Sequence, residues 1–125
     1  MIEKLIFLNK LKFLSYEFDY SQNQYKSVSF FRRTNYSYLF WIELLKGFYD
    51  KKIRTVDQLI LHLKRYGAAT QTVINLIKLA ESNGFLSRVK CNKDKRKTFV
   101  KPENITIQQF EDWSKHLVQG LNKNQ

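Results

Sequence analysis

The sequence predicts an α+β fold that is mostly helical and carries one small sheet. Three observations lead to this prediction. Apolar residues recur with helical spacing along most of the 125 residues. Glycine (4) and proline (1) are scarce, so few residues interrupt helices. Two short β-type runs, at 85–91 and 97–101, flank a turn-prone segment and predict a β-hairpin.

Length and composition predict one domain, 1–125, that can bury a core without disulfides or a metal. The net charge of +11 and the pI of about 9.8 indicate an anionic partner. There is no run of about 18 apolar residues, and the first 14 residues lack a small-residue cleavage site, so we expect no membrane partner. The single cysteine, Cys91, cannot form an internal disulfide, which agrees with a reducing compartment. A cytoplasmic protein is the expectation.

The first third of the chain predicts two helices. Apolar residues from Ile2 to about Phe18 follow a helical pattern, although 16–20 alternate and could be extended. The polar stretch Ser21 to Lys26 predicts a loop. Residues 35–51 are apolar nearly all round, so this helix is expected in the middle of the core. We predict that 1–34 form an N-terminal helix and loop used for dimerisation.

Two shorter helices follow. Thr55 begins a capping-box pattern with Gln58, and Tyr66-Gly67 supplies the end of that helix. The next helix, at about 69–83, buries Val73, Leu76, Ile77 and Ala80 and ends at Asn83-Gly84. A second capping-box pattern, Thr106 with Gln109, predicts the start of a last helix within 103–125.

The hairpin after the second of these helices is strongly basic. It holds a single acid, Asp94, among Arg88, Lys90, Lys93, Lys95, Arg96, Lys97 and Lys101. A helix followed at once by a basic hairpin is the layout of a winged helix, whose helix enters the major groove of DNA while the hairpin reaches the neighbouring backbone or minor groove. The predicted fold is therefore a winged helix-turn-helix, residues 35–102, flanked by N- and C-terminal helices.

Residues 55–118 resemble the winged helix-turn-helix of MarR-type transcription regulators. The resemblance is carried by TVINLIKLAESNGFLSRV, similar to the recognition helix running into the first wing strand, and by DKRKTFV, which matches the D-x-R element of the family at Asp94 and Arg96. It implies that Arg96 enters the minor groove and that Asp94 helps to orient it. It also implies a regulator of transcription that binds double-stranded DNA, and we expect a sequence-specific repressor. The apolar stripes of the first and last helices predict that these helices pack together, within one chain or across a two-fold, and we expect a homodimer.

The candidate DNA-binding residues lie on the helix and on the hairpin. Asn and Gln can make bidentate contacts to adenine, and Lys can reach guanine or phosphate. The same positions could equally be plain solvent-facing ones. Arg32, Arg33 and Arg54 are lesser candidates for phosphate contacts. The principal set is Thr70, Gln71, Thr72, Asn75, Lys78, Arg88, Lys93, Asp94, Lys95, Arg96 and Lys97.

No enzyme is predicted, because the sequence has no Gly-rich phosphate loop, G-x-S-x-G or H-E-x-x-H motif. His62 and His116 have no ligand-spaced partners, so neither a metal nor a cofactor is expected, and no small-molecule effector can be named. Cationic neighbours could make Cys91 a redox sensor, but a half-buried strand cysteine fits the pattern as well. Two alternative functions stay open: a winged-helix module for protein interaction or replication without operator-specific binding, and a peripheral membrane protein using residues 2–18.

Overall fold

The computed structural model describes residues 2–123, apart from the side chains of 20–23 and 120–123. Over this range the chain forms helices and one two-stranded antiparallel sheet, so the predicted fold class is confirmed. In chain order the elements are α1 (Ile2–Gln24), α2 (Lys26–Arg32), α3 (Asn35–Tyr49), α4 (Val56–Lys64), α5 (Thr70–Ser82), β1 (Leu86–Lys90), β2 (Thr98–Pro102) and α6 (Asn104–Lys123).

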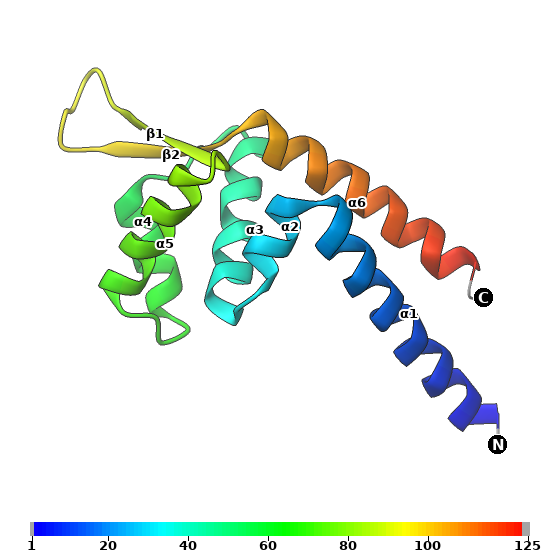
Figure 1. Cartoon of the computed structure of the whole chain (residues 1–125). Helices are drawn as coiled ribbons and strands as arrows, with labels where there is room; N and C mark the ends of the chain where they lie inside the picture. The colour runs from blue at the N-terminus through cyan, green and yellow to red at the C-terminus, as the bar shows by residue number, and fades with distance from the viewer. Residues whose placement is uncertain (1, 124–125) are drawn as a thin grey trace.

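The elements form a helical body with projections on two sides (Figure 1). Helices α2–α5 make the body, and the β1–β2 hairpin, the wing, extends from it on one side. Helices α1 and α6 leave the body together on the other side and contact each other and α2. The wing and the two outer helices therefore lie at opposite ends of the molecule.

The loop predicted at Ser21–Lys26 is wrong. Helix α1 continues to Gln24, Lys26 already begins α2, and residues 16–20 are helical rather than extended. The polar stretch contains neither glycine nor proline, so nothing in it forces a helix to end. The sequence did not predict α2, whose Val28 and Phe31 are fully buried in the core. Tertiary packing decides the structure here, because seven residues are too few for a stable isolated helix.

Helix α3 is the centre of the core, as its apolar sequence predicted. Its Phe40, Trp41 and Leu44 are at most 2% exposed. A capping box starts the helix: Ser37 N donates to Thr34 Oγ1 at 3.1 Å, and Thr34 N donates to Ser37 Oγ at 3.2 Å. The rings of α3 pack on Phe31 of α2 and on the aromatic side chains of α6. Burial of these large rings supplies much of the core's hydrophobic stabilisation.

The predicted signals around α4 and α5 are confirmed. Gln58 N donates to Thr55 Oγ1 at 3.2 Å, and Thr55 N donates to Gln58 Oε1 at 2.9 Å, which completes the capping box. Gly67 and Gly84 follow α4 and α5 with φ of 90° and 78°. Glycine is favoured there because other L-residues adopt this conformation at a cost. Both turns are thus fixed by local chemistry.

The wing is attached to the body through the segment between α3 and α4. The register pairs Leu86 with Pro102 and Arg88 with Val100. On the other side of β2, Val100 N donates to Arg54 O at 2.9 Å, and Thr55 forms an isolated antiparallel bridge with Phe99. Residues 54 and 55 therefore hold β2 at the base of the wing through a single bridge, without forming a further strand.

The capping box predicted at Thr106 is wrong, because both of its side chains are bound elsewhere. Helix α6 begins at Asn104, before Thr106. The Thr106 hydroxyl donates to Phe85 O at 2.6 Å. Gln109 Oε1 accepts from the backbone N of Ser27 at 2.9 Å and also from the Ser27 hydroxyl. These bonds connect α6 to the start of β1 and to the first turn of α2.

Candidate nucleic-acid interface

Helix α5 separates its polar residues from its apolar ones. Val73, Ile77 and Ala80 are buried against the body. The five residues of α5 predicted to contact DNA, Thr70, Gln71, Thr72, Asn75 and Lys78, are all exposed. Gln71 Nε2 donates to Asn75 Oδ1 at 2.8 Å, one turn along the helix. This bond orients the Asn75 amide, and its nitrogen is not used in the bond. The pair therefore has a defined arrangement of donors and acceptors.

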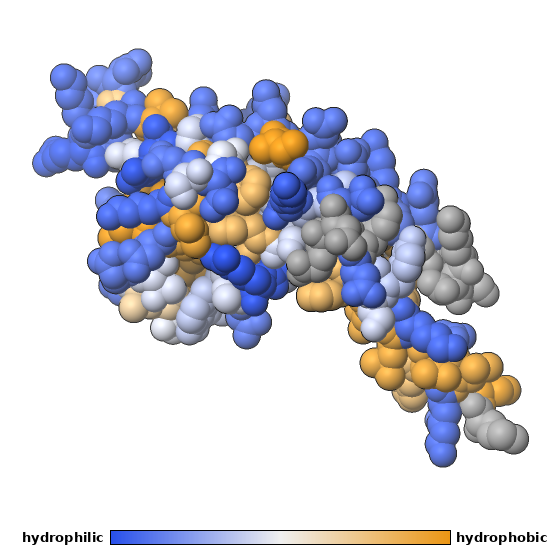
Figure 2. Space-filling view, viewed as in Figure 1, coloured by the Kyte–Doolittle hydropathy of each residue, from blue (hydrophilic) through white to orange (hydrophobic). Residues whose placement is uncertain are grey.

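The wing tip presents cations held by a short turn. Lys93, Lys95, Arg96 and Lys97 are exposed, and the Arg96 side chain is 95% exposed. Asp94 Oδ1 accepts from the backbone N of Arg96 at 3.1 Å and lies 3.5 Å from Arg96 Nε. Asp94 therefore fixes the turn and holds the Arg96 side chain on one side of it. In the space-filling view, hydrophilic side chains cover the end of the wing (Figure 2).

Arg88 lies in a different environment from the cations of the tip. Its guanidinium binds the Glu81 carboxylate on α5, with Nη2 2.8 Å from Oε1. This hydrogen bond lowers the pKa of Glu81 below its ordinary value and raises that of Arg88. The pair connects β1 to α5 and thereby sets the wing relative to the helix. Arg88 thus pairs with a carboxylate of another element, whereas Arg96 lies beside Asp94 of its own turn and stays almost fully exposed.

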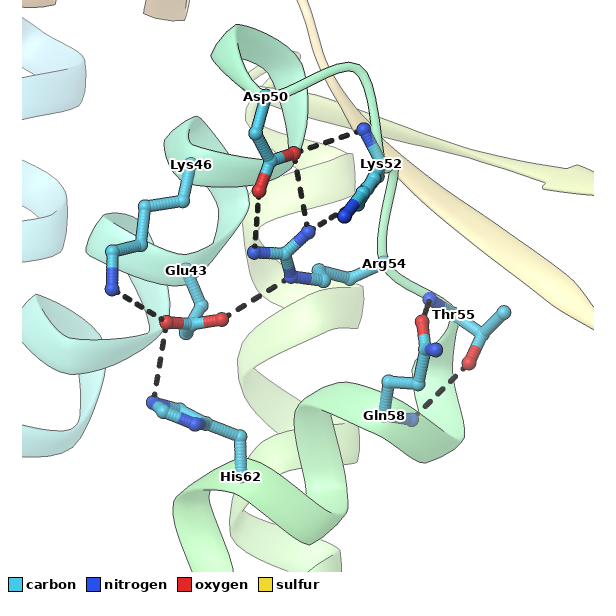
Figure 3. A network of polar contacts seen from close by, with 8 residues as sticks. All are labelled: Glu43, Lys46, Asp50, Lys52, Arg54, Thr55, Gln58 and His62. Atoms are coloured by element: carbon cyan, nitrogen blue, oxygen red, sulfur yellow. Dashed lines mark hydrogen bonds and ion pairs between the residues drawn. The ribbon is translucent and has the colours of Figure 1, made fainter.

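A polar network with Glu43 at its centre joins α3, α4 and the 50–55 segment (Figure 3). Glu43 is 8% exposed. Its carboxylate lies 3.2 Å from Arg54 Nε, 3.4 Å from Lys46 Nζ and 3.5 Å from His62 Nε2. Burial alone would raise the pKa of Glu43, but the hydrogen bond from Arg54 and the charges of His62 and Lys46 outweigh burial and lower it.

Arg54 extends this network to the end of α3. Its Nη2 and Nη1 lie 3.1 and 3.3 Å from the two carboxylate oxygens of Asp50, and Nη1 also donates to Lys52 O. The hydrogen bond with Arg54 is the main cause that lowers the pKa of Asp50. Because the Arg54 carbonyl pairs with β2, the network positions the base of the wing. The Arg54 guanidinium is therefore engaged by two carboxylates of its own chain, although the sequence made it a lesser candidate for phosphate.

We expect Glu43→Gln to destabilise the protein at neutral pH by about 1–3 kcal/mol, the typical cost of leaving buried polar partners unsatisfied. The folded-state pKa of Glu43 lies below its ordinary value of 4.5, so its contribution is complete above that pH and disappears as the pH falls through the folded-state pKa. The wild-type and variant stabilities should therefore converge in acid. Urea unfolding at neutral and acidic pH measures the difference.

Asp112→Asn is the matched control for this experiment, because Asp112 is exposed on α6. It should change the free energy of unfolding little at either pH. A Glu43→Gln effect that is equally large in acid would show that the carboxylate charge is not what stabilises the network.

Neither this network nor a second one near α1 was predicted from the sequence. In the second, the buried Glu17 accepts from Arg32 Nη1 and from Trp113 Nε1, which connects α1, α2 and α6. Arg32 is thereby also engaged inside the protein. A usable signal exists in both cases: Glu43 lies among apolar residues in FWIELL, and Glu17 lies between two aromatic residues in YEF. A charge in such a stretch needs a cationic partner, although the sequence does not identify the partner.

Helix α1 exposes an unusual amount of apolar surface. The exposed fractions include 76% for Ile2 and 62% for Leu11, and Figure 2 shows hydrophobic side chains gathered at the outer end of α1. Val118 of α6 is 55% exposed as well. Consecutive exposed apolar residues on α1 cover more than one face of the helix: Leu5, Ile6, Phe7 and Leu8. A surface of this kind is typical of an interface with another chain.

No protein-family model and no curated protein sequence matches the chain. Solved structures do match it. Transcriptional regulator Tm0710 from Thermotoga maritima superposes with a TM-score of 0.60 at 19% identity, over 98% of this chain and 73% of that one. MepR of S. aureus in complex with DNA gives 0.59 at 18% identity, over 90% and 84% of the two chains. A MarR family protein from Bacillus stearothermophilus gives 0.57 at 16% identity, over 98% and 75%.

These similarities confirm the winged helix-turn-helix fold and the resemblance to MarR-type regulators at the level of the fold. At such identities, function and binding residues do not transfer with the fold. Among the described helices, none is long and apolar enough to cross a membrane. The surface residues of this chain itself decide what it binds.

Proposed function

We propose that the chain is a homodimeric DNA-binding regulator of transcription that represses by occupying promoter DNA. The observation that supports this most is the outward polar face of α5, followed directly by an exposed cationic wing tip. Of the predicted site, Thr70, Gln71, Thr72, Asn75 and Lys78 would lie in the major groove. Lys93, Lys95, Arg96 and Lys97 would contact the neighbouring backbone or minor groove, with Asp94 orienting Arg96. Arg88 would act mainly by setting the wing against α5.

The two parts of this interface differ in what they can recognise. Asn75, oriented by Gln71, offers the donor and acceptor that the major-groove edge of adenine requires. Arg96 is almost fully exposed and flanked by Lys95 and Lys97, so its interaction depends on charge and on groove width. The helix would therefore carry sequence preference and the wing would carry general affinity.

We expect Asn75→Ala and Arg96→Ala to weaken binding in different ways. Asn75→Ala should cost about 1–3 kcal/mol on the preferred site and little on random duplex. Arg96→Ala should weaken both duplexes together and reduce the slope of log affinity against log salt by about one. Fluorescence anisotropy with a selected site and a random duplex measures both effects.

Lys26→Ala is the matched control, since it removes the same unit charge from an exposed position on α2. It should leave both affinities nearly unchanged. Equal losses on both duplexes for Asn75→Ala, or no loss for Arg96→Ala, would contradict the assignment of α5 and the wing. Neither substituted side chain is buried, so the domain should stay folded.

The homodimer part of the proposal rests on the exposed apolar surface of α1 and α6. A two-fold dimer would bury that surface and place two α5 helices on half-sites about one helical turn, roughly 34 Å, apart. We expect the wild type to scatter light as a dimer and Leu11→Glu to shift it towards monomer, because the charge would have to be buried in the interface.

Leu61→Glu is the matched control for the dimer. Leu61 is 66% exposed on α4, away from the outer helices, so a charge there should leave the mass unchanged. A wild-type protein that is monomeric both alone and with duplex DNA would refute the dimer, while monomeric DNA binding would remain possible.

A further inference from the structure

The wing has a hollow on the face that is turned away from α5. Side chains alternate along a strand, so Arg88 and Val100 lie on one face of the sheet while Val89, Phe99 and Lys101 lie on the other. Arg88 binds Glu81 of α5, which identifies its face as the one towards the recognition helix. On the opposite face, an open groove of about 460 Å³ is lined by Lys51, Lys52, Ile53, Val89, Phe99 and Lys101.

The groove combines an apolar floor with a cationic rim. Val89 is 44% exposed, and Ile53 and Phe99 are partly buried, so the three side chains form a partly accessible apolar floor. The rim is formed by the three lysines, and none of the lining residues is acidic. The nearest carboxylate on the 50–55 segment, Asp50, is turned towards Arg54 and the backbone N of Lys52 (Figure 3). The charge of the rim is therefore not matched within the lining of the groove.

The backbone that carries the rim lysines is firmly held. Lys52 N donates to Gly47 O at 3.0 Å, and a Cβ on Gly47 would lie 3.1 Å from Lys52 O. A side chain at this position would push the segment away from α3 by a few tenths of an ångström, because the atoms it would meet are backbone atoms. The Arg54 contacts to Asp50 and Lys52 O hold the same turn from the other side. The wall of the groove is consequently preformed, which lowers the entropy cost of binding there.

Lys51 occupies a position where glycine is the favoured residue. It directly follows the C-cap of α3 and has a φ of 61°, the only positive φ of a non-glycine residue among those described. Left-handed backbone is unfavourable for a residue with a Cβ, and most helices that end in this way use glycine. A lysine side chain is thus present at the rim despite a backbone cost, which suggests a use for its charge.

We propose that this groove binds a short acidic peptide segment with apolar side chains, contributed by a partner protein. The apolar floor would take the hydrophobic side chains, and Lys51, Lys52 and Lys101 would pair with the carboxylates. Phosphates of a duplex would gain nothing from the floor, and a duplex on α5 would lie on the other face of the wing. A small ligand would prefer a site that encloses most of its surface, whereas this groove is open. The site is independent of the proposed DNA interface.

The test is fluorescence anisotropy with a short fluorescein-labelled peptide in which Asp alternates with Leu and Phe. The comparison peptide keeps every Asp and replaces Leu and Phe by Ser. The groove variant is Lys51→Gly with Lys101→Gln, and the matched control is Lys95→Gln with Lys97→Gln at the wing tip. Because Lys51→Gly relieves the left-handed backbone, that substitution should raise stability while it removes a binding contact.

We expect the Asp-Leu-Phe peptide to bind the wild type and the wing-tip variant alike. It should bind the groove variant about tenfold more weakly, because two ion pairs at the surface are lost. The serine peptide should bind poorly to all three. Duplex affinity should fall in the wing-tip variant and stay within about twofold in the groove variant.

Four outcomes would overturn the proposal. Absence of peptide binding to the wild type is the first. Equal losses of peptide affinity in both variants, or equal binding of the serine peptide, would indicate general charge attraction. A loss of duplex affinity in the groove variant as large as in the wing-tip variant would make the groove lysines phosphate contacts.

Discussion

The affinity of the proposed dimer for any duplex should fall by roughly 10³–10⁵ between 50 and 200 mM salt if it neutralises about six to ten phosphates. The reason is the release of counterions from DNA as cations approach its backbone. Each chain carries 22 Lys and Arg against 11 Asp and Glu, a net charge of +11, and the wing tip presents its cations without internal carboxylate partners apart from Asp94. Titrations of a random duplex at several salt concentrations measure the slope.

The double variant Lys95→Gln and Lys97→Gln tests whether the wing tip is responsible for the salt slope. Removal of two tip charges should reduce the slope for a dimer by up to about four, because each chain loses two phosphate contacts. A wild-type slope near zero would refute the DNA-binding proposal as a whole. A normal slope that the double variant leaves unchanged would instead place the phosphate contacts elsewhere on the chain.

Elements fixed by local chemistry could be predicted from the sequence. Helix α4 begins where Thr55 and Gln58 cap it, and the glycines after α4 and α5 adopt positive φ, as the pattern predicts. The same pattern at Thr106 failed, because capping competes with tertiary partners. Phe85 O takes the Thr106 hydroxyl, and Ser27 takes the Gln109 amide oxygen. A sequence motif shows that a local bond is possible, but it does not show that no distant partner binds better.

In the candidate site, too, local features could be predicted from the sequence and tertiary contacts could not. Exposure of Asn75 and of the wing-tip cations follows from helical periodicity and from the position of the turn, both of which are local. The engagement of Arg88 by Glu81 joins a helix to a strand across a turn, and that of Arg54 by Glu43 joins residues 11 apart in the chain. A count of charges in the sequence does not distinguish these two arginines from Arg96. Only the fold separates the cations that position the wing from those available to a partner.

The two polar networks hold the parts of the proposed regulator in place. The Glu43 network sets the base of the wing, and the Glu17 network sets the outer helices against α2. In a two-fold dimer the outer helices would determine how far apart the two α5 helices lie. Substitutions in the Glu17 network should therefore affect stability and the recognition of paired half-sites together.

Arg32→Ala should destabilise the protein by about 3–5 kcal/mol, because it leaves a buried carboxylate without its cation. Glu17 is 3% exposed, and Trp113 Nε1 would remain as its donor. The double variant Arg32→Ala and Glu17→Gln should recover part of this loss, since an uncharged amide oxygen can still accept from Trp113 and costs less to bury. Urea unfolding of the wild type and both variants gives the free energies.

Arg33→Ala is the matched control. Arg33 neighbours Arg32 but is exposed, and its guanidinium lies 4.4 Å from the centroid of the Phe30 ring, so its loss should cost only about 0.5–1 kcal/mol. Amide hydrogen exchange should rise first in α1 and α6 of Arg32→Ala, because the lost contact holds these helices to α2. A double variant no more stable than Arg32→Ala would show that the buried charge is not the cause. If exchange rose uniformly, Arg32 would stabilise the whole fold rather than the position of the outer helices.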